Sequence, residues 1–317
     1  MVSSQTFPFR ASMLERSIGD AVEFLVNCQQ KDGGFPVARW HSNGALVEED
    51  SLFSTACILL AIGELLPSQC RHAALSLLQR RCDPQGFWHF DALGDLPADA
   101  DCTACALAAL VRFAQAPEKQ TLSIVDRLAT FVRPNGRIAT WLATDSLAGT
   151  HTDDDVVAAN VIYAAALCDA SRARFWLMQW LKLRTAKTDE YFGSNRTSSV
   201  MLNIVSEKMQ PATPYYIHIE TIGYTWARTL GSLGLARPVL ALTNTTFNSP
   251  LRCALALSIM DAPPHRDLIS LLLKSQHSSG GWAAEPWFQS PGASFGSASL
   301  TTAFAVEALN QQRGNMG

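Results

Sequence analysis

The sequence lacks the features that would link it to a membrane or to nucleic acid. No uncharged apolar run approaches the roughly 20 residues of a membrane-spanning helix, and the first stretch, MVSSQTFPFRASMLERSIGD, lacks the continuous apolar core of a signal peptide. The 317 residues include 25 Lys and Arg against 28 Asp and Glu, with no basic stripe for a nucleic-acid partner. We therefore expect a cytoplasmic protein that has no spanning segment and binds no nucleic acid.

The sequence also lacks the usual marks of metal and phosphate sites. It has no glycine-rich phosphate loop, and its seven histidines form no H-x-x-x-H pair. Cys253 and His265 are zinc candidates by residue type only, so we predict no metal. Four of the eight cysteines, Cys57, Cys105, Cys168 and Cys253, lie inside apolar helical runs, which predicts reduced, buried thiols.

Helix-forming segments, by contrast, fill the chain between short glycine and proline islands. Apolar positions recur at helical spacing, as in Leu52, Ala56, Leu59 and Leu60, and no clear alternating strand appears. The predicted helices number about twelve, at 13–28, 51–66, 69–81, 101–115, 119–132, 154–169, 173–185, 215–231, 235–245, 249–260, 265–276 and 297–311.

The predicted helices are of two kinds that alternate along much of the chain. CTACALAALVRF, VVAANVIYAAAL and LTTAFAVEAL are apolar nearly all round, and a helix that is apolar on every side is buried on every side. Segments such as SIGDAVEFLVNCQQ carry one polar face and suit an outer layer. Helix pairs repeated along the chain predict an all-α fold, a single closed barrel of six inner and six outer helices. We expect one domain over 1–317, with its barrel core at about 13–311.

A short motif marks the ends of several outer helices. QQKDGGF at 29–35 and QHSSGGW at 276–282 both fit Q-x-x-x-G-x-(F/W), while CDPQGFW at 82–88 and VRPNGRI at 132–138 are weaker copies. The glycine ends the helix in a left-handed turn, and the glutamine amide can bond backbone groups freed at helix ends. These repeats resemble those of the squalene and oxidosqualene cyclases and of the wider group that includes protein prenyltransferase β subunits. The resemblance implies an (α/α)6 barrel.

Acidic residues stand at the starts of the predicted inner helices. Asp99 and Asp101 begin the run before ALAAL, Asp154 precedes VVAANVIYAAAL, and Glu220 lies early in YYIHIETIGYTWAR. Aspartate is a preferred helix cap, and a negative charge suits the positive end of the helix dipole. If the inner helices are parallel, these residues share one rim, where they could also bind a cation or supply protons. Both interpretations stay open at this point.

The stretch D-A-D-C-T-A at 99–104 adds a second resemblance. It is similar to the D-x-D-D-T-A motif of squalene-hopene and class II diterpene cyclases and to the D-C-T-A motif of oxidosqualene cyclases. In both motifs the aspartate that matches Asp101 is the Brønsted acid that starts cyclisation. The resemblance implies that Asp101 protonates an alkene or an epoxide, supported by Asp99 and Cys102. Asp154 or Glu220 could then remove the final proton.

This chemistry makes demands on the surroundings of the acid. An alkene is a very weak base, so the acid must be undissociated, held among apolar walls, and supplied with donors for the carboxylate it leaves. The cation must be shielded from water and stabilised by aromatic faces. The predicted substrate-binding residues are Phe53, Trp141, Asn160, Tyr163, Tyr215, Tyr216, Tyr224 and Trp226.

Three functions are compatible with these residues. The first is an acid-initiated cyclase-like enzyme, or a related hydratase or isomerase, that takes a small apolar isoprenoid and needs no cofactor. The second is a transferase or lyase that uses a prenyl diphosphate on the same barrel and would need Mg²⁺. The third is a non-catalytic binding or scaffold barrel in which D-A-D-C is only a helix cap. A second copy or a partner chain could complete the site in any of them.

Overall fold

The computed structural model describes residues 11–42, 44–90, 96–114, 116–133, 136–142, 154–184, 215–235, 247–260, 265–290 and 292–315. This part of the chain forms eleven α-helices and four short strands. No helix within it combines the length and the hydropathy that crossing a bilayer requires.

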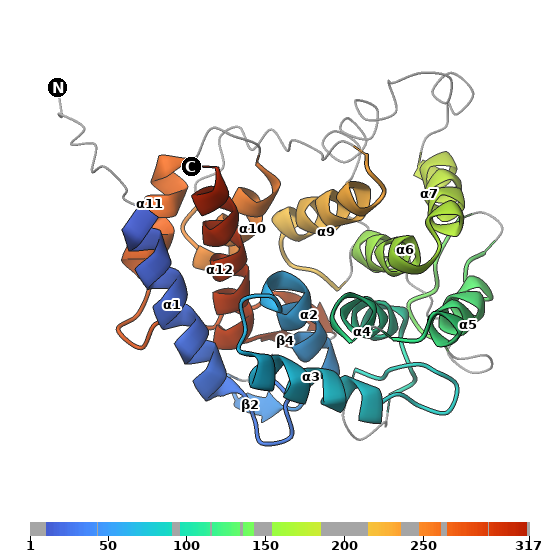
Figure 1. Cartoon of the computed structure of the whole chain (residues 1–317), viewed down its shortest axis with the longest axis horizontal. Coiled ribbons are helices and arrows are strands. Elements are labelled where there is room, and N and C mark those ends of the chain that lie inside the picture. Colours follow the sequence, from blue (N-terminus) through green and yellow to red (C-terminus); the bar gives the residue numbers. More distant parts are fainter. Residues whose placement is uncertain are drawn as a thin grey trace.

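Six helices form a closed inner ring (Figure 1). They are α2 (Leu52–Ile62), α4 (Ala100–Phe113), α6 (Asp155–Cys168), α9 (Ile219–Ser232), α10 (Pro250–Ile259) and α12 (Ala298–Gly314). Each packs against the next one in this order, and α12 packs against α2. Nearly every residue of α2, α4 and α6 is buried. The prediction of buried inner helices from their apolar composition is confirmed.

The outer helices cover the gaps of this ring. They are α1 (Ala11–Cys28), α3 (Ser68–Arg80), α5 (Glu118–Ala129), α7 (Ala170–Arg184) and α11 (Arg266–Ser275). α1 packs on α12, α3 on α2 and α4, α5 and α7 on α6, and α11 on α10. The predicted helix over 235–245 falls almost wholly outside the described residues. The one predicted over 215–231 begins only at Ile219, so Tyr215 and Tyr216 belong to the loop before α9.

A small antiparallel sheet corrects the expectation of an all-α chain. Strands β1 (Val37–His41), β2 (Leu46–Glu49), β3 (Phe288–Ser290) and β4 (Ala293–Gly296) pair in the order β2-β1-β4-β3. Arg39 lies opposite both Val47 and Phe295, which joins two segments far apart in the sequence. The strands have three to five residues and are mostly half-buried or exposed, so they carry no alternating pattern that could be recognised.

The first glutamine motif ties three helices together. Gln29, after the end of α1, donates hydrogen bonds from Nε2 to the carbonyl oxygens of Gly33 and Cys70, both at 2.9 Å. The first bond closes the turn, and the second reaches α3. The backbone N–H of Phe35 donates to Thr55 Oγ1 on α2 at 2.9 Å. One motif therefore connects two outer helices and one inner helix.

The motif near the C-terminus repeats this arrangement and closes the outer layer. Gln276 Nε2 donates to the carbonyl of Gly280 at 2.6 Å and to that of Ser17 on α1 at 2.9 Å. The backbone N–H of Trp282 donates to Thr302 Oγ1 on α12 at 3.0 Å. This second copy thus connects the C-terminal part of the chain to α1.

The weaker copy at 82–88 keeps only half of these contacts. The Trp88 backbone N–H donates to Thr103 Oγ1 on α4 at 3.1 Å, and the Trp88 indole donates to the carbonyl of Leu78 at 2.8 Å. Cys82 stands where the other copies have glutamine, and its thiol contacts the neighbouring Asp83 carbonyl at 3.6 Å instead of a second outer helix. The region between α3 and α5, here called the seam, therefore lacks the hydrogen bond by which a glutamine amide joins two outer helices in the full copies.

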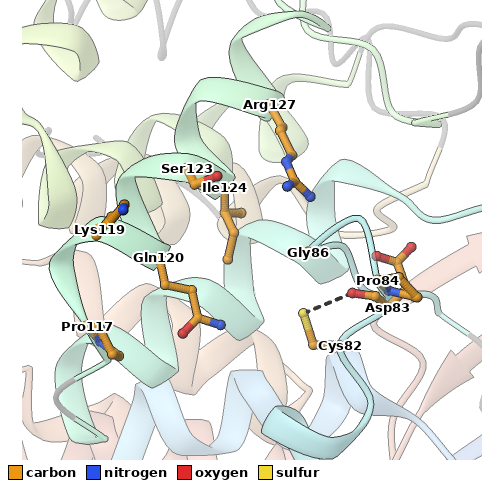
Figure 2. Close-up of a pocket in the computed structure, with 10 residues that line it drawn as sticks. All are labelled: Cys82, Asp83, Pro84, Gly86, Pro117, Lys119, Gln120, Ser123, Ile124 and Arg127. Atoms are coloured by element: carbon orange, nitrogen blue, oxygen red, sulfur yellow. Dashed lines mark hydrogen bonds between the residues drawn. The ribbon is translucent and has the colours of Figure 1, made fainter.

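A surface hollow of about 500 Å³ opens at this seam (Figure 2). Cys82 and Gly86 lie on one side of it, and Gln120, Ile124 and Arg127 of α5 lie on the other. In the two full copies the turn glycines pack tightly on an outer helix. A Cβ atom at Gly33 would lie 2.3 Å from the backbone oxygen of Ala73, and one at Gly280 would lie 2.2 Å from that of Asp20. At Gly86 the nearest atom is the Ile124 side chain, at 3.1 Å. The turn at Gly86 therefore packs less closely against the next outer helix than the turns of the two full copies do.

Restoring the glutamine should stabilise the fold. We expect Cys82→Gln to raise the free energy of unfolding by about 1 kcal/mol, because a buried amide gains hydrogen bonds across the seam. Thermal denaturation measures the change, and Gln29→Cys is the matched control, which should lower the melting temperature. If Cys82→Gln leaves the protein no more stable while Gln29→Cys weakens it, a glutamine amide does not stabilise this seam as it does at the full copies.

Candidate functional site

The carboxyl of Asp101 lies in the interior near the start of α4. Asp99 caps this helix, because its side chain accepts a hydrogen bond from the Cys102 backbone N–H at 2.7 Å. The side chain of Asp101, two residues later, does not cap the helix, and Asp101 is only 8% exposed. One oxygen accepts a hydrogen bond from Asn160 Nδ2 at 2.6 Å, and the other accepts one from the Tyr216 hydroxyl. Capping and contact with the interior are thus divided between the two aspartates.

Neighbouring inner helices explain why Asp101 points inward. α2 is capped by Ser51 and α6 by Asp154, as α4 is by its own aspartate. Two residues after each cap come Phe53 in α2 and Val156 in α6, and both are buried. This position belongs to the core in each helix. In α4 it places a carboxyl group in apolar surroundings.

Arg228 of α9 fixes the orientation of the Asn160 amide. Its Nη2 donates to Asn160 Oδ1 at 2.6 Å. A guanidinium group only donates hydrogen bonds, so it must face the amide oxygen. The NH₂ end of Asn160 is then left to donate to Asp101. Three residues from three inner helices form the chain Arg228–Asn160–Asp101.

Tyrosine rings surround the guanidinium group of Arg228. Its Cζ lies 4.6 Å from the ring centroid of Tyr163 and 5.5 Å from that of Tyr224. The Tyr224 hydroxyl donates to Glu307 Oε2 on α12 at 2.7 Å. Both tyrosines were predicted to bind the substrate, whereas Arg228 and Glu307 were not among the predicted site residues. Arg228 follows Tyr224 by one helical turn, which is the signal that could have placed it on the same face.

Aromatic rings extend from Tyr216 toward the other side of the ring of helices. Tyr216 and Trp287 have centroids 5.7 Å apart, and Trp287 stacks on Phe53 at 5.6 Å. Trp287 also meets Phe304 of α12 edge-on at 4.8 Å. Phe53 was predicted from the sequence, whereas the segment that supplies Trp287 and Phe288 was not recognised as part of the site. Phe288 closes the group with a T-shaped contact to Phe53.

Burial makes the carboxyl groups of this region weak acids. It raises the pKa of Asp101, while the hydrogen bonds from Tyr216 and Asn160 and the charge of Arg228 lower it again. Burial also raises the pKa of Asp99 and of Asp154 to about 7 each. Asp101 contributes to both shifts because two negative charges close together disfavour ionisation. Asp99 and Asp154 therefore stay protonated to a higher pH than an ordinary aspartate does.

The predicted supporting residues take different positions. Asp154 accepts hydrogen bonds from the backbone N–H groups at the start of α6 and from that of Tyr215 at 3.4 Å. The Cys102 thiol is buried beside Asp99, and burial raises its pKa well above the ordinary value, so it stays neutral. Glu220 is fully buried and forms an ion pair with Arg252 at 2.7 Å, instead of a contact with Asp101.

Two further predicted aromatic residues, Trp226 and Trp141, have different surroundings. Trp226 packs against Trp180 of α7, with centroids 4.3 Å apart, so it faces an outer helix. Trp141 is half-buried and pairs through its backbone with Asp99. The helical periodicity placed Trp226 on an inner helix correctly but did not distinguish the inward face from the outward one.

Two spacings in the sequence resemble catalytic motifs but have structural roles. Cys102 and Cys105 are spaced C-x-x-C on α4, yet burial contributes to raising the pKa of both thiols well above the ordinary value, which leaves them unreactive. The run G-A-S-F-G at 292–296 has the spacing of a nucleophile elbow. Its Ser294 lies within β4, paired opposite Trp40 and Gln289, and not at a strand-to-helix turn.

No cluster of three or more His, Cys, Asp and Glu side chains suited to a metal ion occurs among the described residues. Asp153 and the basic residues at 185–214 lie outside the described residues. They therefore do not test the expectation that a diphosphate substrate would be bound with Mg²⁺.

The raised pKa values predict how stability depends on pH. Asp99 and Asp154 have an ordinary pKa of 3.8 in the unfolded chain and about 7 in the folded protein. The folded state therefore binds more protons than the unfolded state between these values, and the two groups lower the free energy of unfolding as the pH rises from about 4 to 7. Urea unfolding across this pH range should show that the free energy of unfolding depends less on pH in Asp99→Asn and in Asp154→Asn than in the wild type. The exposed control Asp267→Asn should match the wild type, and an unchanged slope in both site variants would contradict the assigned shifts.

Solved structures with the same architecture provide a comparison. The chain matches the type II terpene cyclase MstE from Scytonema with a TM-score of 0.69 at 20% identity, over 95% of this chain and 98% of that one. An MstE variant in complex with geranylgeranyl dihydroxybenzoate, its substrate, matches at 0.68 and 19%, over 96% and 99%. The ent-copalyl diphosphate synthase from Streptomyces platensis matches at 0.52 and 13%, over 82% of this chain and 50% of that one.

No protein-family model matches the sequence, and no curated protein does. At these identities the structural matches establish the fold. Because the match covers 98% of the MstE chain, that cyclase consists almost wholly of this architecture. The resemblance drawn from the glutamine motifs is confirmed at this level: the chain has the α/α toroid fold of the type II terpene cyclases.

Proposed function

We propose that the protein is an acid-initiated isoprenoid cyclase in which Asp101 is the Brønsted acid. The observation that carries this proposal is the burial of the Asp101 carboxyl group in an apolar interior with a donor at each oxygen, Asn160 at one and Tyr216 at the other. Burial favours the neutral acid that must be present before reaction. The two donors stabilise the carboxylate that remains after the proton has left.

The proposed step is a simple proton transfer. The O–H bond of Asp101 breaks as the π electrons of a terminal alkene take the proton. With an epoxide the oxygen takes the proton, and a C–O bond of the ring breaks to leave a hydroxyl group. The carbocation that forms is attacked by the next double bond of the folded chain, and a final proton is lost to a base. Rings of the group Phe53, Tyr216 and Trp287 can stabilise the cation through their π faces. The barrel interior beside them is the proposed substrate cavity.

Asp154 is the better of the two predicted bases. Its pKa of about 7 suits a group that accepts a proton near neutral pH, and Asp101 is close enough to raise that pKa. Glu220 is held by Arg252 in an ion pair and is less available. We assign the final deprotonation to Asp154 and regard Glu220 as a support of α9.

The apolar interior and the comparison proteins support an isoprenoid as the substrate class. MstE acts on a geranylgeranyl chain attached to dihydroxybenzoate. For this chain we propose an isoprenoid with a terminal alkene or epoxide, processed by protonation and not by loss of diphosphate. A transferase that ionises a prenyl diphosphate is the second candidate, but no metal-binding carboxylate group supports it among the described residues.

Replacement of the acid tests the proposal directly. The protein is incubated with prenyl alcohols, prenyl diphosphates, their terminal epoxides and prenylated hydroxybenzoates, and products are identified by mass spectrometry. Asp101→Asn should abolish cyclisation, because the amide has no acidic proton, while Asp169→Asn at the start of α7 should retain it. Retained turnover in Asp101→Asn would refute Asp101 as the acid. Release of diphosphate that depends on Mg²⁺ would favour the transferase.

The two donors should contribute to kcat and not to binding. We expect Tyr216→Phe and Asn160→Leu each to lower kcat about a hundredfold, as the loss of one preorganised donor does in other active sites. KM should change little, because the hydrogen bonds are made to the acid and not to the substrate. Steady-state kinetics measure both constants. A rise in KM with unchanged kcat would place these residues in substrate binding instead.

A further inference from the structure

Arg228 is unusual among the arginines of this structure because its charge lies inside the ring of helices. Arg39, Arg112, Arg172 and Arg252 all have a carboxylate partner within 4.0 Å. No such partner is found for Arg228 among the described residues, and its buried Nε has no hydrogen-bond partner there. A charge in such a place is costly unless something nearby compensates it.

Two contacts hold this charge in place. The tyrosine rings of α6 and α9 lie beside the guanidinium group at 4.6 and 5.5 Å from their centroids. Its Nη2 donates to Asn160 Oδ1, and Asn160 donates in turn to Asp101, both at 2.6 Å. The carboxylate form of Asp101 is therefore linked to the cation through one amide.

We propose that Arg228 is a positioning residue for the acid: it holds the Asn160 amide with its N–H side toward Asp101, and its charge stabilises the carboxylate that Asp101 becomes. This inference rests on the proposed function of Asp101 as the acid. Without Arg228, the Asn160 amide could turn over and present its oxygen to Asp101, which would repel the developing negative charge. Arg228 thus makes a buried, weak acid strong enough to protonate an alkene.

Other groups near the acid act on the same equilibrium and must be considered with it. The titratable and charged groups that face Asp101 are Asp99, Cys102 and Cys105 of the α4 segment, Asp154 before α6, Tyr216 before α9, and Arg228. Those that face Arg228 from α2, α4, α6 and α9 are Cys57, Cys105, Tyr163 and Tyr224, with Glu307 of α12 behind Tyr224. Arg228 is the only cation in this set, so its removal should disfavour the carboxylate form of Asp101.

The test measures the acid itself, independently of turnover. Infrared titration follows the carbonyl band of protonated Asp101, assigned by its disappearance in Asp101→Asn. Arg228→Met should raise the pKa of Asp101 by about one unit, because an opposite charge that favoured the carboxylate has been removed. Arg228→Lys keeps the charge and should leave the pKa near the wild-type value. The matched control is Arg174→Met, which removes an arginine whose hydrogen bond within the described part of the chain goes to the Leu233 carbonyl.

The pH dependence of the reaction supplies a second measurement. In Arg228→Met, kcat should fall at least tenfold, while the limb on which activity is lost at high pH should move upward by about one unit. A merely structural role would lower activity without moving this limb. Unchanged pKa and limb in Arg228→Met would overturn the inference. A shifted pKa in a protein that turns over no substrate would retain the role of Arg228 and reject the proposed function instead.

The contribution of the amide can be separated from that of the charge. In the Asn160→Leu background, Arg228→Met should raise the pKa of Asp101 by less than it does in the wild type, because the group that Arg228 orients is gone. An equal shift in both backgrounds would show that only the charge matters and would contradict the positioning role. If Arg228→Met does not fold, Arg228→Gln takes its place in the same cycle.

Discussion

The carboxyl group of Asp101, buried between α4, α6 and the loop before α9, is the constraint on which the site depends. Desolvation opposes its ionisation, while the amide of Asn160, the hydroxyl of Tyr216 and the charge of Arg228 favour it. Burial therefore favours the neutral acid, and the groups that stabilise its conjugate base are already in place. This combination suits the protonation of a very weak base, because the stabilising dipoles need no rearrangement during the reaction.

The framework of the fold supplies this position without strain. Asp99 and Asp154 take up the capping of α4 and α6, which frees Asp101 to face inward. Thr103, in the same short motif, accepts a hydrogen bond from the Trp88 turn, just as Thr55 and Thr302 do at the full glutamine motifs. Thr103 thus belongs to the architecture of the repeat. Asp101, two residues before it, differs from the residues at the equivalent positions of α2 and α6, which are Phe53 and Val156.

Much of this arrangement could be predicted from the sequence. Helices apolar on all sides indicated the inner ring, and the spacing of glutamine, glycine and aromatic residues indicated the turns. The resemblance around 99–104 singled out Asp101, and one helical turn along an apolar segment suggested Asn160. What the sequence could not give was the pairing between distant segments. Tyr216 reaches Asp101 across 115 positions of the chain, and the small sheet brings 37–49 beside 288–296 through strands too short to show a period.

The errors have physical reasons as well. Trp226 and Tyr224 lie on the same inner helix two positions apart, about 200° around its axis, so only one of them can face inward. Arg228 was not placed beside Asp101, because only the packing of α6 against α9 brings Asn160 and Tyr163 to its guanidinium group. Glu220 lies at a helix start like the other acids, but its partner Arg252 comes from the next inner helix and could not be inferred from local sequence.

The most direct measurement of the central claim is the origin of the proton that enters the product. With a cyclising substrate from the panel that carries a terminal alkene and no epoxide, the reaction is run in D₂O and the product is examined by NMR and mass spectrometry. The account predicts one deuteron at the carbon that was the terminal alkene position, delivered to a single face, because Asp101 exchanges its proton with solvent between turnovers. A cyclised product that carries no solvent-derived deuteron at that carbon would contradict it.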